Sequence, residues 1–113
     1  MNIEQEIKAK GLTAPRVTPT DVEDEIASEY YFTGGAKYGR ITRDEPDHSE
    51  ALKLLIFCVL VLRNGFTVTG ESACASPENY DLLVGQRIAR RKAVEKIWPL
   101  LGFRLRDELA KAK

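Results

Sequence analysis

The apolar positions of the chain form one continuous run in its middle and spaced repeats on either side. The run, Leu54–Leu62, is rich in β-branched residues, which is typical of a strand covered on both faces. Asn64-Gly65 follows, and this pair favours a two-residue hairpin turn because both positions tolerate positive φ. Beyond the turn, Phe66–Ala73 alternates apolar and polar residues, as a strand with one face in water does. The pattern predicts an antiparallel β-hairpin with strands at about 53–62 and 66–73.

The residues before the hairpin predict an N-terminal helix at about 19–31. Pro19 suits the first turn of a helix, and Val22, Ile26 and Tyr30 then repeat every four residues. This spacing would place the three apolar side chains on one helical face, with acidic residues on the other.

A long C-terminal helix is predicted at about 77–98 and, after a kink, at about 100–112. Ser76-Pro77 has the form of an N-cap followed by proline at the first helical position. Pro99 must bend or end the helix, because proline donates no backbone hydrogen bond and clashes with the preceding turn. Gly102 is expected to separate the last helical segment from the one before it.

Small residues form a stripe along this helix at four-residue spacing, namely Gly85, Ala89 and Ala93. Such a stripe lets another backbone approach closely, and we expect that backbone to belong to the sheet or to an equivalent helix. A second, bulkier face carries Tyr80, Leu83, Val94 and Trp98 between arginines. A helix that is apolar on two sides usually packs on two sides. We therefore expect a homo-oligomer.

With 113 residues the chain is expected to form a single domain, 1–113, of the α+β class. Two strands alone are not stable. The hairpin must therefore be covered by the helices, extended by a strand from Gly35–Thr42, or paired with another subunit.

Charge does not point to a nucleic acid or an anionic membrane, because 17 basic residues balance 17 acidic ones. The charges are nevertheless segregated, with an acidic segment at Thr20–Tyr31 and a basic one at Gln86–Lys96. Two interpretations stay open. The segments attract each other, within the fold or between subunits, or the basic face is kept free for an anionic ligand.

No catalytic or metal-binding pattern is present, and we expect neither an enzyme nor a cofactor. Cys58 lies in the apolar run and is interpreted as a packed core residue. His48, the single histidine, stands in an acidic stretch with Asp44, Glu45 and Asp47, and one histidine without a spaced partner makes a poor metal site. The first ten residues lack the apolar region of a signal peptide, and Leu54–Leu62 is too short to span a bilayer. A cytosolic protein with no membrane partner is expected.

Several segments together resemble a widespread family of short tailed-phage and prophage proteins. They are NGFTVTGESAC at 64–74, SPENYD at 76–81 and IWPLLGF at 97–103, with GLTAPRVTP at 11–19 and YYFTGG at 30–35. The resemblance implies a phage-encoded accessory protein in the cytoplasm of the infected bacterial host cell. It brings no catalytic residues with it.

The function favoured by the residues is binding of a nucleotide-like or phosphorylated host immune signal, which the protein would sequester. Arginine grips phosphate bidentately, and an aromatic ring can stack on a base. The candidate ligand-binding residues are Arg87, Arg90, Arg91, Tyr80 and Trp98. The first alternative is a protein that binds and modulates a host protein during phage takeover. Nucleic-acid binding is the second alternative, and zero net charge counts against it.

Overall fold

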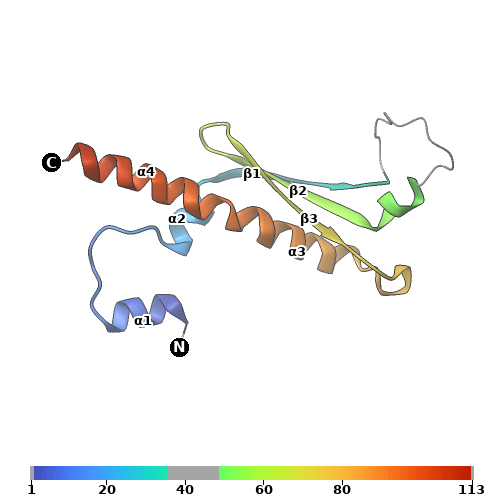
Figure 1. Cartoon of the computed structure of the whole chain (residues 1–113), viewed down its shortest axis with the longest axis horizontal. Helices are drawn as coiled ribbons and strands as arrows, with labels where there is room; N and C mark the ends of the chain where they lie inside the picture. Colours follow the sequence, from blue (N-terminus) through green and yellow to red (C-terminus); the bar gives the residue numbers. More distant parts are fainter. Residues whose placement is uncertain (1, 36–48, 113) are drawn as a thin grey trace.

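A computed structural model describes residues 2–35 and 49–112 as an antiparallel sheet of order β1-β2-β3 lying on a long, bent C-terminal helix (Figure 1). This confirms the α+β class. The strands are β1 (Ile26–Thr33), β2 (Leu55–Leu62) and β3 (Thr67–Ala73). The helices are α1 (Ile3–Ala9), α2 (Pro19–Asp24), α3 (Leu82–Glu95) and α4 (Ile97–Lys111), with 3₁₀ helices at Ser49–Leu54 and Pro77–Asn79.

The hairpin of β2 and β3 forms where it was predicted. Gly65 has φ +89°, whereas Asn64 does not have a positive φ. The Leu62 amide donates to the Phe66 carbonyl and the Gly65 amide to the Leu62 carbonyl, so the loop has three residues with glycine in the left-handed position, and not two residues with positive φ at both. In the register of the pair, Cys58 faces Gly70 and Val61 faces Thr67. One face of β2 is buried at every second position, while the other face is only half-buried. The described parts of one chain thus cover β2 on a single face, not on both.

The helix predicted at 19–31 is wrong beyond Asp24, since β1 occupies Ile26–Thr33 and supplies the third strand. Residues four apart share a face in a helix and also in a strand, so the spacing of Val22, Ile26 and Tyr30 did not distinguish the two. The aromatic and β-branched residues at the end of the segment favour the strand. The strand proposed at Gly35–Thr42 lies almost wholly outside the described residues.

The C-terminal helix begins later than predicted. Ser76 makes no side-chain cap; α3 instead starts after Asp81, whose carboxylate accepts a 2.9 Å hydrogen bond from the Val84 amide. The bend falls at Lys96, directly after the carbonyl of Glu95 that Pro99 cannot satisfy, which confirms the predicted kink. Gly102 does not break the helix but lies inside α4.

The sheet and α3 meet at unusually close range through the small-residue stripe. Gly85, Ala89 and Ala93 are buried against the sheet, so the stripe's partner is the sheet and not a second helix. A β-carbon on Gly70 of β3 would overlap the Ala89 carbonyl oxygen and the Ala93 amide nitrogen. Beside this contact, the Ser72 hydroxyl donates a 3.0 Å hydrogen bond to the Gly85 carbonyl. Side chains from α2, β2, β3 and α4 complete the core: Val22, Ile56, Cys58, Leu60, Leu62, Val68, Ile97 and Leu101.

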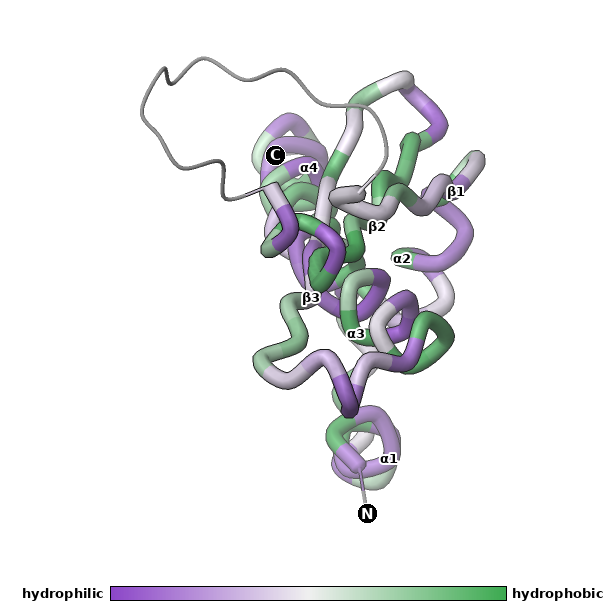
Figure 2. Tube along the Cα trace, turned by 90° about the vertical axis from the view of Figure 1, so that its right-hand side faces the viewer, coloured by the Kyte–Doolittle hydropathy of each residue, from purple (hydrophilic) through white to green (hydrophobic). Residues whose placement is uncertain are grey.

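The molecule is elongated, with extents of 60 × 33 × 22 Å. Its radius of gyration is 18.8 Å, against about 13 Å for a compact domain of this length. The end of α4 extends past the sheet, and α1, which has no buried residue, stands apart from the body in both views (Figures 1 and 2).

Replacing Gly70 by alanine should destabilise the fold by about 3 kcal/mol, because the methyl group would meet helix backbone that cannot move aside. Gly85→Ala should cost less, since the nearest obstacle there is the flexible end of the Ile56 side chain. Urea denaturation monitored by circular dichroism measures both. Equal effects at the two positions would contradict the close backbone approach at Gly70.

Gly102→Ala should stabilise the protein by about 0.5–1 kcal/mol. Gly102 is exposed and inside α4, and an added β-carbon meets nothing within 4 Å. The same denaturation experiment tests this change, and a loss of stability would show that α4 does not continue through Gly102.

Candidate functional site

Arg90 is held by two carboxylates from different elements. Its Nη1 and Nη2 donate to the two carboxylate oxygens of Glu23 at 3.0 and 2.8 Å, and its Nε donates to Glu29 at 2.9 Å. Glu23 lies on α2 and Glu29 on β1, so this cluster joins both elements to α3. The hydrogen bonds from Arg90 lower the pKa of Glu23, and the two carboxylates raise the pKa of Arg90 further above its already high value. The acidic and basic segments therefore do pair within one chain, through Arg90.

A second ion pair ties α4 to the junction between α2 and β1. Arg104 donates to both oxygens of Glu25, at 2.7 and 3.4 Å, and these bonds lower the pKa of Glu25. Arg63, from the hairpin turn, donates through its side chain to the Asp24 carbonyl and through its backbone to the Glu25 carbonyl. This cluster was not predicted from the sequence. Arg63 and Arg104 lie outside the basic segment Gln86–Lys96, whereas Asp24 and Glu25 lie inside the acidic segment, so the segregation of charge alone did not indicate the pairing.

Arg87 and Arg91 are placed differently from Arg90. Both are exposed, and the geometry of a helix puts them one turn apart on the face of α3 that points away from the sheet. Within residues 2–35 and 49–112, no ion pair is recorded for either guanidinium. Leu83, at 62% exposure, extends the same face toward the start of α3. We call Leu83, Arg87 and Arg91 the outward face of α3.

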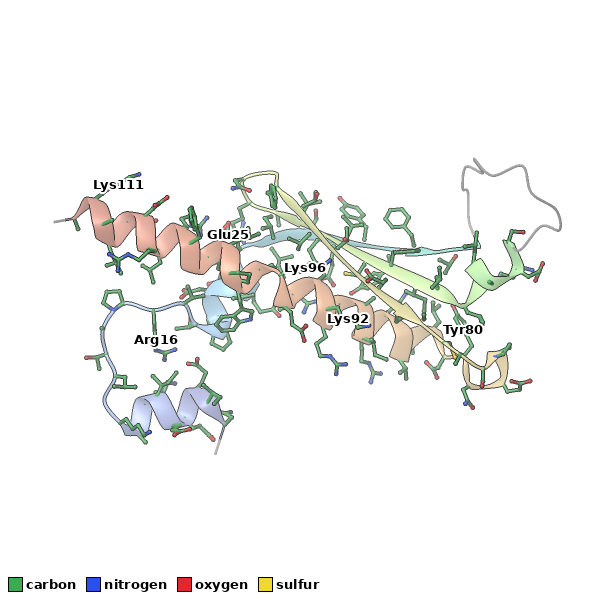
Figure 3. The ribbon with its side chains drawn as sticks, in the orientation of Figure 1. Arg16, Glu25, Tyr80, Lys92, Lys96 and Lys111 are labelled. Carbon is green, nitrogen blue, oxygen red and sulfur yellow. The ribbon has the colours of Figure 1, made fainter. Side chains whose placement is uncertain are left out.

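The two aromatic candidates lie at opposite ends of α3. Tyr80 precedes the helix, packs against the core and lines a cavity of about 290 Å³ with Ser72 and Gly85. Trp98 is the second residue of α4 and lines a different cavity, of about 660 Å³, beside α1. The length of helix between them spans about 25 Å, and Figure 3 shows Tyr80 at the far end of α3 from Glu25, with Lys92 and Lys96 between. One chain therefore does not bring Tyr80 and Trp98 together around one ligand.

A third cavity, of about 390 Å³, combines charges of both signs at the junction of α2 and α4. Arg16, Arg63 and Arg104 line it together with Asp24, Glu25 and Glu108. Arg16 also pairs with Glu4 at 2.8 Å. Because its arginines already have carbonyl or carboxylate partners, this cavity offers little free positive charge to an anion.

Other chemistry is limited in the described residues. Cys58 is fully buried, as predicted, and burial raises the pKa of its thiol, which keeps the sulfur protonated and unreactive. The described residues contain no group of three histidine, cysteine or acidic side chains that could hold a metal ion. His48 and its acidic neighbours lie outside those residues. None of the described helices is long and apolar enough to cross a membrane.

Glu23→Gln should destabilise the protein by about 1 kcal/mol at pH 7, since it removes the two-pronged carboxylate from a partly exposed pair. The contribution should also depend on pH. The pKa of Glu23 is lower in the folded than in the unfolded state, so its stabilisation is complete above about pH 5 and is lost as the pH falls. Urea denaturation at several pH values between 3 and 7 measures this.

Glu95→Gln is the matched control, because Glu95 is exposed on α3, the helix that carries Arg90, and has no ion pair within the described residues. It should change stability by less than about 0.5 kcal/mol. Identical acid sensitivity in the wild type and Glu23→Gln would contradict the role given to the Glu23–Arg90 pair.

The comparisons with known proteins place the chain in a family. No curated protein and no solved structure matches it. The family model of the phage protein (N4 Gp49/phage Sf6 gene 66) family matches residues 17–109, which include everything from the segment before α2 to near the end of α4. The resemblance seen in the sequence is confirmed, and the chain belongs to the phage protein (N4 Gp49/phage Sf6 gene 66) family.

Proposed function

We propose that this phage protein binds and sequesters a nucleotide-like or other phosphorylated small molecule of the infected bacterium, without converting it. The observation that carries the proposal is the outward face of α3, where Arg87 and Arg91 are exposed and have no recorded ion-pair partner within the described residues. Guanidinium groups one helical turn apart can hold neighbouring phosphate oxygens bidentately. Such a binder would act in the cytoplasm of the host cell.

Arg90 has a supporting part in this proposal. Its guanidinium is occupied by Glu23 and Glu29, so it holds α3 against α2 and β1 and does not contact the ligand. The orientation of Arg87 and Arg91 depends on that attachment. Arg90→Ala should therefore weaken stability first and ligand binding only indirectly.

Tyr80 and Trp98 of one chain cannot stack together on the same base, because they lie at opposite ends of α3. Trp98 is 38% exposed and can present one side of its ring. In an oligomer, the ring of one copy could complete the site formed by the arginines of another. A nucleotide site between subunits is thus the form of the proposal that fits the separation of the two aromatic residues.

A thermal-shift screen against mononucleotides, cyclic nucleotides and pyrophosphate tests the proposal, followed by calorimetric titration of any hit. At a ligand concentration 100 times the Kd, the stabilisation should be about 2.7 kcal/mol, which corresponds to roughly 10 °C in Tm. The double variant Arg87→Ala/Arg91→Ala should bind at least about tenfold more weakly, because it loses two charge-assisted contacts.

Arg106→Ala is the control, since Arg106 is an exposed arginine of α4 with no recorded ion pair in the described residues. It should bind as the wild type does. No shift with any phosphorylated compound at millimolar concentration would overturn the proposal. Binding of a short single-stranded oligonucleotide alone, with a steep dependence on salt, would favour the nucleic-acid alternative.

Binding of a host protein is the second candidate, and it is favoured by exposed apolar side chains on the first half of α4. Phe103 is 73% exposed and Leu100 lies one turn before it. Exposed aromatic residues are enriched at the centres of protein interfaces. If this function holds, Phe103→Ser should abolish recovery of a specific bacterial protein that the wild-type protein retains from lysate, and Arg87→Ala/Arg91→Ala should not.

A further inference from the structure

The face of the sheet that points away from α3 is apolar along two of its three strands. The pairing places Tyr30 beside Val59, and Val59 beside Thr69, on that face. The next row joins Phe32, Phe57 and Glu71 in the same way. We call it the open sheet face; its positions are Ser28, Tyr30, Phe32, Leu55, Phe57, Val59, Val61, Thr67, Thr69, Glu71 and Ala73.

No described element covers the open sheet face. α3 and the first turn of α4 lie on the opposite side of the sheet (Figure 1). Tyr30 is 51% exposed and Phe32 53%, and the β2 side chains between them and β3 are half-buried by their strand neighbours. A strand that is apolar on both faces normally has a layer packed on each. Within residues 2–35 and 49–112, β2 has a layer on one face only.

The total surface of the chain shows that this gap is part of a wider excess. The chain exposes 8552 Å², whereas a compact monomer of 12.7 kDa exposes about 6,200 Å². The open sheet face contributes to this excess together with α1, which has no buried residue, and the end of α4, which extends past the sheet.

The distribution of charge on the open sheet face fits a second copy of the same chain. Across a two-fold axis the same patch meets itself, so any charge near the axis is brought close to its own copy. Among the positions of this face only Glu71 is charged, and it lies on the edge strand β3. The aromatic and β-branched positions of β1 and β2 carry no charge that would repel.

We propose that the open sheet faces of two copies pack on each other. Two three-stranded sheets would then form a sandwich with the sheets about 10 Å apart, and Tyr30, Phe32, Phe57 and Val59 would make up its inner layer. This contact does not depend on the proposed ligand. It leaves the outward face of α3 accessible, because that face lies on the far side of the sheet.

The oligomeric mass of the purified protein tests the proposal, measured by sedimentation equilibrium or by light scattering after gel filtration. The wild type should have an even multiple of the 12.7 kDa chain mass. Tyr30→Thr/Phe32→Thr keeps strand propensity and removes both exposed rings. The dissociation constant of the dimer of this variant should be about 100-fold higher than that of the wild type, because each aromatic anchor at an interface contributes a factor of about ten or more to the affinity.

Phe103→Thr is the control, because Phe103 is more exposed than either ring but lies on α4. It should leave the mass unchanged. Thr69→Arg provides a second variant on the open sheet face: it removes no buried group and should separate the copies by introducing like charge. Circular dichroism confirms that each variant is folded.

Two outcomes would overturn the proposal. One is a wild-type protein that stays at 12.7 kDa up to about 100 μM, a concentration at which obligate interfaces are saturated. The other is a folded Tyr30→Thr/Phe32→Thr or Thr69→Arg variant with the wild-type mass. Loss of mass in Phe103→Thr alone would place the interface on α4 instead.

Discussion

The fold depends on the close approach of α3 to the sheet at Gly70. A helix normally packs on a sheet through large side chains, whereas here the carbonyl and amide groups of Ala89 and Ala93 approach the backbone of β3 itself. Only small residues fit on the inner side of α3. The larger and charged residues of that helix must therefore lie at its margins and on its outer side, which is why Arg87 and Arg91 are exposed. The packing constraint and the candidate binding surface thus have one cause.

Much of this arrangement could be read from the sequence, because its signals are local. Asn64-Gly65 specifies the hairpin turn, and the spacing of Gly85, Ala89 and Ala93 specifies a close contact. The strand β1 was missed because a four-residue repeat suits both helix and strand, and the decision between them rests on pairing with β2, which is remote in sequence. The start of α3 was misplaced because Ser76 and Asp81 are both good caps, and only the position of the helix on the sheet selects Asp81.

The candidate site could be predicted only as a region. Segregation of charge left open whether the acidic segment and the basic helix pair or the basic face stays free, and Arg90 shows that they pair at this one residue. Which arginine would pair depends on the rotation of α3 about its axis, and that rotation is set by Gly70. Arg90 lies at the margin facing β1 and α2, while Arg87 and Arg91 lie about 60–100° further round. A sequence shows three arginines within one turn and a half, whereas the packed helix divides them into one structural and two available groups.

The same packing leaves two different surfaces on opposite sides of the molecule. A domain of one sheet and one helical layer can bury one face of each, and an exposed helical face can be polar without cost. An exposed face of β2 cannot be polar, because the strand carries apolar residues on both of its faces. A third layer would bury this face of the sheet, whereas the polar outward face of α3 has no such need. If a second copy supplies that layer, the basic faces of the two copies point away from each other, and the assembly presents its arginines outward, where an anionic ligand or another pair of copies can reach them.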